Sequence, residues 1–317
     1  MTPQTVFLFS GQGSQYFHMG RSLYDGNATF REWMERLDAL AQQALGTSVV
    51  DALYSGRNGK SDPFDRILLT HPAIFMVEYS LARALMASGV RPDMVLGASL
   101  GSFAAAAVAG FIGAEDALHA VIRQASVIDE CGEAGGMTAV LAEPALFAEE
   151  FIRGRSELAA INFSSHFVVS ARRMDLAEIE AALAEREIVY QRLPVSFPFH
   201  SRWIEKAESG FASAMAAVRC ERGRVPLVCC DRAEILAELP AGYFWDVVRR
   251  PIRFTETMAR LEREGARRYI DAGPAGTLAT FLKYGLPANS TSTVHAILTP
   301  FGSDQQRFAA VVGSIGS

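Results

Sequence analysis

The sequence predicts an α/β protein in which a small ferredoxin-like domain interrupts a larger domain built on a parallel sheet. Short strand patterns alternate with longer helical ones over residues 1–134 and again from residue 201, which is typical of a parallel, doubly wound sheet. Over residues 135–200 the order changes to βαββαβ, the split βαβ arrangement. We therefore predict a discontinuous large domain, residues 1–134 and 201–317, and an inserted small domain, residues 135–200.

The first part of the large domain begins with a strand of β-branched and aromatic residues that ends in a glycine turn. A long helix further on is closed by Gly89 and Pro92, as helix ends commonly are. The next strand is buried and runs through a second glycine turn into an Ala-rich helix. The elements expected here are strands at residues 5–9 and 94–96 and helices around residues 30–40 and 74–88.

The inserted domain and the second part of the large domain supply the remaining elements. The small domain is expected to contain strands at residues 137–141, 158–162, 167–170 and 189–193 and helices at residues 144–152 and 176–185. Strands are then expected at residues 226–230 and 268–271, the second followed by a glycine-containing turn at residues 273–276. The two segments of the large domain should therefore complete one sheet.

Composition and charge exclude several classes of protein. The chain has 317 residues, is 50% hydrophobic and 10% aromatic, and carries a net charge of −5, which indicates a folded chain and not a disordered one. Without a block of Lys and Arg, a nucleic-acid partner is not expected. The longest uncharged apolar stretch, residues 103–114, is too short to span a membrane, and no signal-peptide pattern is found, so we expect a cytoplasmic protein. The four cysteines form no CxxC pair, so we expect reduced thiols and no zinc site.

Residues 97–101, Gly-Ala-Ser-Leu-Gly, match the pattern G-x-S-x-G. In this pattern the glycines allow a strained turn between a strand and a helix, and the turn exposes the serine hydroxyl. The buried strand before it and the apolar helix after it provide that context. We therefore predict that Ser99 is a nucleophile and that the backbone N–H of Leu100 is available to an oxyanion. The alternative is a small-residue turn that only packs a helix on a sheet.

A nucleophilic serine needs a base, and His200 is the best placed of the six histidines. It follows an aromatic segment at the point where the chain returns to the large domain, where it can face the cleft between the domains. The alternative is a packed or surface histidine. No comparable setting is found for His18, His119, His166 and His295. Cys131 is an alternative nucleophile, but no basic residue lies near it in sequence, so an inert thiol is favoured.

The turn Gly11-Gln12-Gly13 after the first strand has two interpretations. A dinucleotide site is disfavoured, because Tyr16 stands where the third glycine of G-x-G-x-x-G should be. Backbone N–H groups that point toward a neighbouring strand end would instead form half of an oxyanion hole.

Further strings accompany these motifs along essentially the whole chain. They are FSGQGSQ at residues 9–15, THPA at residues 70–73, GASLG at residues 97–101, Gly136-Met137, Asn162, Phe199-His200-Ser201, PIRF at residues 251–254 and DAGP at residues 271–274. In this order they resemble the malonyl-CoA:acyl carrier protein transacylase family, which includes the acyltransferases of fatty-acid and polyketide synthases. The resemblance implies an α/β-hydrolase-like large domain with a ferredoxin-like insertion, in agreement with the organisation above.

The resemblance also implies roles for individual residues. By position, Ser99 would accept the acyl group and His200 would be its general base. The backbone N–H groups of Gln12 and Leu100 would form the oxyanion hole, and a backbone carbonyl within residues 249–251 would orient the histidine. The implied substrate is an acyl thioester of acyl carrier protein or of coenzyme A. Phosphopantetheine or coenzyme A is then part of the substrate, and no bound cofactor or metal is expected.

Three positions that the family uses around the acyl group differ in this sequence. Ala98 precedes the nucleophile where the family usually has His, and His71 replaces the Gln of T-Q-P-A. Gln124 stands at the position of the arginine that pairs with the carboxylate of malonyl groups. Arg123 lies one residue earlier, about 100° around a helix, so it should not substitute unless the alignment slips by one residue.

These differences favour a neutral acyl group. A buried malonyl carboxylate that faces Gln124 would lose its ionic partner, and such a loss costs roughly 3 to 5 kcal/mol. A short neutral group, acetyl above all, is therefore expected, and the bulk of Phe199 is consistent with a narrow pocket. The predicted acyl pocket consists of Gln124, His71, Ala98, Phe199 and Asn162.

The sequence therefore favours a serine enzyme of polyketide biosynthesis that hydrolyses short acyl groups from acyl carrier protein, because family members without this arginine resemble editing acyl hydrolases. The first alternative is a malonyl- or acyl-CoA:acyl carrier protein transacylase, and the second is an inactive scaffold that binds carrier proteins. Carrier proteins are usually acidic, so docking would need a local basic patch. Candidates for it are Arg202, Arg249, Arg250 and Arg253.

Overall fold

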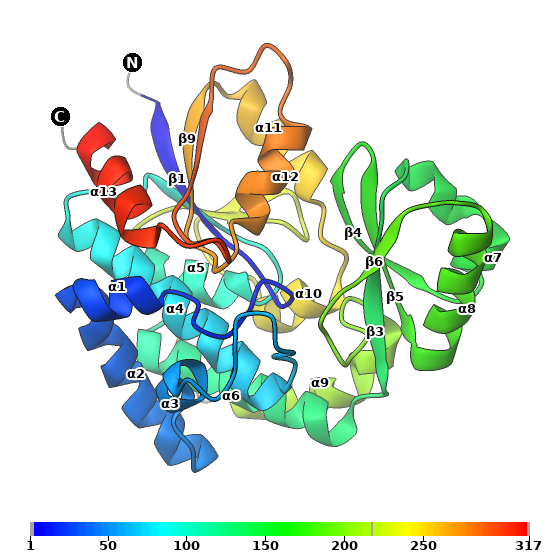
Figure 1. Cartoon of the computed structure of the whole chain (residues 1–317), viewed down its shortest axis with the longest axis horizontal. Helices are drawn as coiled ribbons and strands as arrows, with labels where there is room; N and C mark the ends of the chain where they lie inside the picture. The colour runs from blue at the N-terminus through cyan, green and yellow to red at the C-terminus, as the bar shows by residue number, and fades with distance from the viewer. Residues whose placement is uncertain (1–2, 217, 316–317) are drawn as a thin grey trace.

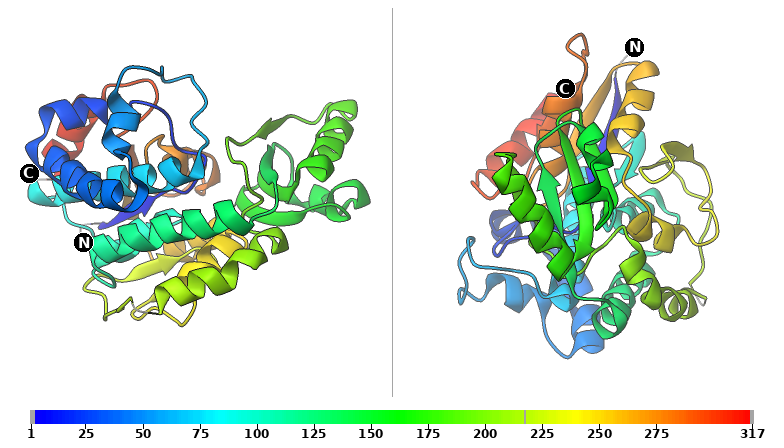
Figure 2. Two further views of the ribbon diagram at one scale, coloured as in Figure 1. Left: turned by 90° about the horizontal axis from the view of Figure 1, so that it is seen from below. Right: turned by 90° about the vertical axis from the view of Figure 1, so that its right-hand side faces the viewer.

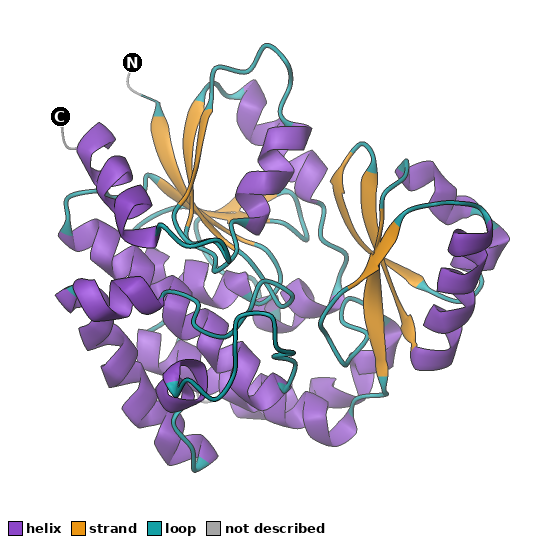
Figure 3. Ribbon diagram, viewed as in Figure 1, coloured by secondary structure: helices purple, strands orange, loops and turns teal. Residues whose placement is uncertain are grey.

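The computed structural model describes residues 3–216 and 218–315, which form two sub-domains, each with its own sheet (Figure 1, Figure 3). The predicted fold class, an α/β protein with a parallel sheet and an additional ferredoxin-like sheet, is confirmed. The strands of the large sheet are β1 (Gln4–Phe9), β2 (Met94–Gly97), β7 (Leu227–Cys229), β8 (Glu234–Leu236), β9 (Arg267–Asp271) and β10 (Thr293–Ala296). Their order is β10-β9-β1-β2-β7-β8, and all neighbours are parallel except the β7–β8 pair at one edge.

Helices cover both faces of this sheet. They are α1 (Arg21–Gly26), α2 (Ala28–Leu45), α3 (Val49–Tyr54), α4 (Ile67–Ala87), α5 (Gly101–Ala109), α6 (Ala114–Cys131), α9 (Glu208–Met215), α10 (Tyr243–Arg249), α11 (Phe254–Arg263), α12 (Thr277–Gly285) and α13 (Asp304–Ile315). Alternate residues of β1 point to opposite layers, as the period of two of a strand requires. Phe7 and Phe9 belong to the core formed with α2, α4, α5 and α6, whereas Val6 and Leu8 pack in a second core with residues of α11 and α12.

The small sub-domain has the predicted βαββαβ order. Its elements are β3 (Gly135–Val140), α7 (Glu150–Arg153), β4 (Glu157–Phe163), β5 (His166–Arg172), α8 (Arg173–Glu185) and β6 (Tyr190–Arg192). The sheet order β4-β5-β3-β6 is antiparallel throughout, and α7 and α8 cover its outer face (Figure 1). The helix expected over residues 144–152 is divided into a 3₁₀ turn, Pro144–Ala148, and α7, because Glu149 between them is extended.

Two elements of the large sub-domain differ from the expectation. Helix α4 begins at Ile67, seven residues before the expected start, so that Thr70, His71 and Pro72 lie inside it. The short edge strands β8 and β10 were not expected. None of the helices in residues 3–216 and 218–315 is both long and apolar enough to cross a membrane.

The two sub-domains are joined by backbone hydrogen bonds as well as by the chain. The N–H of Ile252 donates to the carbonyl of Ala159 at 2.8 Å, and the N–H of Ile161 donates to the carbonyl of Ile252 at 3.1 Å. Strand β4 therefore lies against the segment that leads into α11. Figure 2 shows the small sub-domain at one end of the molecule, away from both chain termini. Since β1 and β2 are parallel neighbours, the loops that follow them begin at the same edge of the sheet.

Candidate active site

Ser99 lies in a tight turn between β2 and α5. Its φ of 55° is in the left-handed region, which is uncommon for a residue other than glycine and marks a constrained position. The flanking glycines are needed for close packing. A side chain at Gly97 would overlap the backbone of Ser102, and one at Gly101 would overlap the carbonyl of Phe9. The turn has the strand–turn–helix geometry expected of the G-x-S-x-G pattern.

His200 lies within hydrogen-bond distance of Ser99. Its Nε2 is 2.9 Å from the Ser99 Oγ, and its Nδ1 is 2.6 Å from the carbonyl oxygen of Arg250. A carbonyl oxygen can only accept, so Nδ1 carries the hydrogen and the lone pair of Nε2 faces the serine hydroxyl. The carbonyl belongs to the expected interval, residues 249–251. The histidine also has a positive φ of 60°, and its own N–H donates to the carbonyl of Val248 at 2.9 Å.

The imidazole is uncharged at neutral pH. The pKa of His200 is lowered to about 4, chiefly by burial and to a smaller extent by the nearby charge of Arg249, while the hydrogen bond to the Arg250 carbonyl acts in the opposite direction. A neutral imidazole has the free lone pair that a general base requires. The pair of side chains can therefore take a proton from the serine and return it to a leaving group.

The loop after β1 packs against the serine turn. A Cβ on Gly11 would lie 2.9 Å from the Ser99 Cβ and 3.4 Å from the Leu100 nitrogen, so only glycine allows this approach. Within the described residues, the N–H groups of Gln12 and Leu100 donate to no other group of the chain. Two unengaged donors beside a serine hydroxyl are what an oxyanion hole needs, and their predicted role remains a prediction.

A cavity of about 280 Å³ opens at this serine between the two sub-domains. Most of its wall is apolar, with Met137 and Val168 from the small sub-domain and Ile252 and Leu278 from the large one. Ser99, His200 and Gln12 line it, and so do three of the predicted acyl-pocket residues, Ala98, Phe199 and Asn162. The residues that line it within the described chain include no Lys, Arg, Asp or Glu.

The other two predicted acyl-pocket residues, His71 and Gln124, are buried and do not line this cavity. The His71 ring lies behind Phe199, with the ring centroids 5.5 Å apart. Among the described residues, neither side chain has a hydrogen-bond partner for its polar atoms. Burial lowers the pKa of His71 to about 3, so this histidine is neutral as well. Arg123, the residue before Gln124, is exposed.

Comparison with known proteins identifies the family. The acyl transferase domain family matches residues 6–314. The chain is 45% identical over 316 residues to the polyketide biosynthesis acyltransferase homolog BaeD of Bacillus velezensis, covering 99% of this chain and 98% of BaeD. It is 42% identical to the homolog PksD of Bacillus subtilis, covering 98% and 96% of the two chains. This chain belongs to the acyl transferase domain family. Among solved structures, it is similar to a loading acyltransferase from the avermectin modular polyketide synthase, with a TM-score of 0.90, 26% identity and coverage of 99% of this chain and 100% of the other.

One further residue lines the cavity of this acyltransferase-family protein. His166 follows the β4–β5 turn, and its Nδ1 accepts a hydrogen bond from the Asn162 amide at 3.1 Å. Its ring lies against Phe163 and Phe281, at centroid distances of 5.0 and 5.3 Å. The sequence around His166 gives no sign of a functional setting, because only the folded hairpin brings this residue opposite α12. Its spacing of four residues from Asn162 was the available signal.

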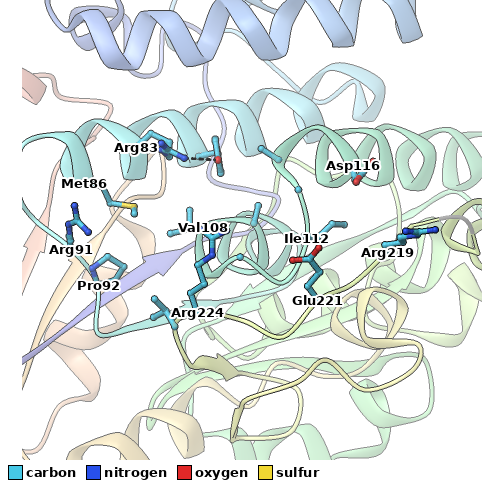
Figure 4. A pocket seen from close by; sticks show the side chains of 16 residues that line it. Arg83, Met86, Arg91, Pro92, Val108, Ile112, Asp116, Arg219, Glu221 and Arg224 are labelled. Atoms are coloured by element: carbon cyan, nitrogen blue, oxygen red, sulfur yellow. Dashed lines mark hydrogen bonds between the residues drawn. The ribbon is translucent and has the colours of Figure 1, made fainter.

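A second, larger hollow of about 660 Å³ does not include Ser99, and Figure 4 shows the side chains that line it. It is found at the opposite end of α5 and includes Val108 and the start of α6. The described residues that line it include no serine and no histidine, so it offers no nucleophile and base pair. Its charged residues are Arg83, Arg91, Asp116, Arg219, Glu221 and Arg224.

The remaining sequence candidates lie outside the acyltransferase cavity. Cys131 is an exposed free thiol at the end of α6, and it does not line the cavity. Among the described residues, no group of three His, Cys, Asp or Glu side chains is arranged to hold a metal ion.

The four arginines considered for carrier docking each form an ion pair within the chain. The pairs are Arg202–Glu157 at 2.9 Å, Arg249–Glu205 at 2.6 Å, Arg250–Asp246 at 3.2 Å and Arg253–Glu256 at 2.6 Å.

Proposed function

We propose that this protein is a serine enzyme of polyketide biosynthesis that hydrolyses short, neutral acyl groups, acetyl above all, from the phosphopantetheine arm of acyl carrier protein. The family match and the names of its relatives BaeD and PksD support acyl-thioester chemistry in that pathway. The observation that carries the choice of acyl group is the pair of neighbouring residues on α6. Gln124 is buried and uncharged, whereas the cation of Arg123 is exposed.

In the first step the acyl group moves to the enzyme. The Ser99 Oγ attacks the thioester carbonyl while the His200 Nε2, 2.9 Å away, takes its proton. The N–H groups of Gln12 and Leu100 hold the negative charge of the tetrahedral intermediate. As this intermediate collapses, the C–S bond breaks, and the imidazolium gives its proton to the thiolate of phosphopantetheine. The products are acyl-Ser99 and a free carrier thiol.

In the second step water releases the acyl group. The His200 imidazole takes a proton from water, the water oxygen attacks the ester carbonyl, and the C–O bond to Ser99 breaks. The proton returns to the serine oxygen, and a carboxylic acid leaves. The family resemblance supports water as the acceptor, because family members that lack the arginine at the position of Gln124 resemble editing acyl hydrolases.

Selectivity against malonyl follows from charge. A malonyl group would bring a carboxylate into a cavity whose described wall has no cation. Gln124 and His71, buried outside that wall, are both neutral and supply no cation either. Desolvation of that carboxylate without a partner costs roughly 3 to 5 kcal/mol, or a factor of about a hundred to several thousand in rate or affinity. An acetyl group carries no such penalty.

A transacylase is the second candidate, in which a thiol and not water accepts the acyl group. The similarity over nearly the whole chain to a loading acyltransferase, at a TM-score of 0.90, favours it. Both candidates share the acyl-Ser99 intermediate, so the identity of the second acceptor distinguishes them.

The test is intact-protein mass spectrometry of carrier proteins loaded with acetyl or malonyl groups, with and without the enzyme. We expect acetyl to be lost at least about a hundredfold faster than malonyl, leaving the holo carrier. Ser99→Ala should abolish this loss, whereas Ser213→Ala, an exposed serine on α9, should not change it.

Three outcomes would contradict the proposal. Efficient loading of malonyl from malonyl-CoA would overturn the charge argument. Transfer of acetyl from acetyl-CoA to the carrier that is faster than hydrolysis would favour the second candidate. Undiminished activity of Ser99→Ala would exclude the acyl-serine mechanism.

A further inference from the structure

A buried carboxyl group lies beneath the loop that follows β1. Glu78, on α4, has no exposed surface, and its Oε1 accepts a hydrogen bond from the N–H of Ser10 at 2.7 Å. The Ser10 hydroxyl also lies 3.1 Å from the same oxygen. No Lys, Arg or His side chain pairs with Glu78 in the part of the chain that the structure describes. A buried acid without a cation needs another explanation for its presence.

A second buried carboxyl group approaches Ser10 from the other side. Asp271 ends β9 and accepts hydrogen bonds from the N–H groups of Gly273 and Ala279, both at 2.8 Å. A side chain at Gly273 would overlap the Ser10 hydroxyl, so this turn packs directly on Ser10. Ser10 is therefore held between α4 and the end of β9.

Burial raises the pKa of both carboxyl groups. Burial raises the pKa of Asp271 to about 6, against the effect of its N–H bonds, so Asp271 is ionised at neutral pH. Burial and the nearby charge of Asp271 raise the pKa of Glu78 well above its ordinary value, although its bonds to Ser10 act in the opposite direction. The raised pKa favours the neutral carboxyl of Glu78, and its Oε1 is the acceptor for the Ser10 N–H.

The position of Ser10 determines where the next two residues lie. Gly11 touches the Ser99 turn, since a Cβ there would be 2.9 Å from the Ser99 Cβ. Ser14 closes the loop by donating from its Oγ to the Gly11 carbonyl at 2.8 Å. A shift of Ser10 would therefore move the N–H of Gln12 relative to the serine.

We propose that Glu78 is a positioning residue that anchors the loop at Ser10 and so sets the Gln12 N–H at the site of the developing oxyanion. This role rests on the proposed chemistry at Ser99, because the oxyanion forms only when an acyl group or its analogue reacts there. In this role, Glu78 on α4 affects the rate of the chemical step and not the binding of the carrier protein.

The test compares Glu78→Ala with Glu78→Gln in the full-length protein. The alanine variant removes the acceptor, and we expect kcat for deacetylation of acetyl carrier protein to fall by about a hundredfold, as on loss of one oxyanion donor, with KM nearly unchanged. The glutamine variant keeps a neutral oxygen for the Ser10 N–H, so its kcat should stay close to that of the wild type. Leu81→Ala, a buried cavity-forming change in the same helix, controls for lost stability and should leave kcat unchanged.

A second readout separates this proposal from the proposed function. The rate at which an organophosphonate labels Ser99, followed by intact mass, needs no carrier protein and no particular acyl group. We expect Glu78→Ala to slow labelling and Glu78→Gln to restore it. A wild-type protein that is labelled but deacetylates nothing would refute the proposed function, and the Glu78 variants would still be tested by labelling. The positioning role would be overturned if Glu78→Ala were labelled at the wild-type rate, or if Glu78→Gln were labelled as slowly as Glu78→Ala. It would also be overturned if Leu81→Ala lost as much activity as Glu78→Ala.

Discussion

At the scale of single residues, the burial of His200 predicts the acid limit of the proposed activity. The neutral imidazole is the active form, so activity is lost as the pH falls through the pKa of this residue in the folded protein. Because that pKa is about 4, and not the 6.5 of an exposed histidine, kcat/KM should be flat from pH 8 down to about pH 5. The measurement is the rate of organophosphonate labelling of Ser99 across this range.

Circular dichroism at each pH provides the control, since it shows whether the protein is folded. An inflection near pH 6.5 in the folded protein would mean that the histidine is more exposed to water than its burial in the structure indicates.

Gln124 provides a second prediction at this scale. In Gln124→Arg a guanidinium replaces a buried neutral amide, and a malonyl carboxylate could then pair with it. We expect the ratio of malonyl to acetyl acylation of Ser99 to rise at least about tenfold. The melting temperature without substrate should fall, because an unpaired buried charge is costly. Intact mass and a thermal melt measure the two effects.

Arg123→Gln is the matched control, since the side chain of Arg123 is exposed. It should change neither the acylation ratio nor the melting temperature. If a folded Gln124→Arg protein kept the wild-type ratio, or if Arg123→Gln lost malonyl acylation, the acyl group would not approach α6 where the resemblance implies.

At the scale of elements, local patterns predicted the strand, turn and helix around Ser99. The strand at residues 94–96, the glycine turn and the Ala-rich helix appear as β2, the Ser99 turn and α5. The glycines were informative because their positions permit contacts that no other residue permits, such as that between Gly101 and the carbonyl of Phe9. The βαββαβ order was predicted because short apolar and β-branched runs alternate there with longer helical patterns.

Other elements depend on tertiary contacts that no local pattern contains. Helix α4 extends through Pro72 to Ile67, although a proline inside a helix loses one backbone hydrogen bond, because nearly all of the helix is buried. Strands β8 and β10 are short edge strands, each held by a single neighbour. The helix at residues 144–152 was wrong as one element, since the extended residue Glu149 divides it.

The candidate site was also predicted only in part. Motif and position pointed to Ser99 and His200, but the carbonyl that orients the histidine could be assigned only to the interval 249–251. The structure identifies it as that of Arg250. Sequence position alone also could not show that His71 and Gln124 are buried without lining the cavity, because burial depends on how α4 and α6 pack.

At the scale of the whole molecule, the distribution of charge bears on docking of an acidic carrier protein. The net charge is −5, so attraction must come from local cations. Two of the candidate arginines, Arg202 and Arg249, share the carboxylate of Glu157, at 2.9 and 3.3 Å. Arg249 is also within one residue of the carbonyl that holds His200. Their charges are therefore largely balanced at the surface beside the active site.

This balance predicts that Glu157→Gln strengthens docking. The substitution frees Arg202 and removes the weaker of two partners of Arg249, which stays paired with Glu205. We therefore expect KM for acetyl carrier protein to fall severalfold at low salt, while kcat changes little. At high salt the difference should vanish, because screening shortens the range of surface charges to about 3 Å at 1 M. Glu178→Gln makes the same change of charge at the Arg155 pair on the small sub-domain and is the matched control. A KM that falls equally in both variants would reflect net charge alone, and a KM unchanged in Glu157→Gln would mean that the carrier binds to another face.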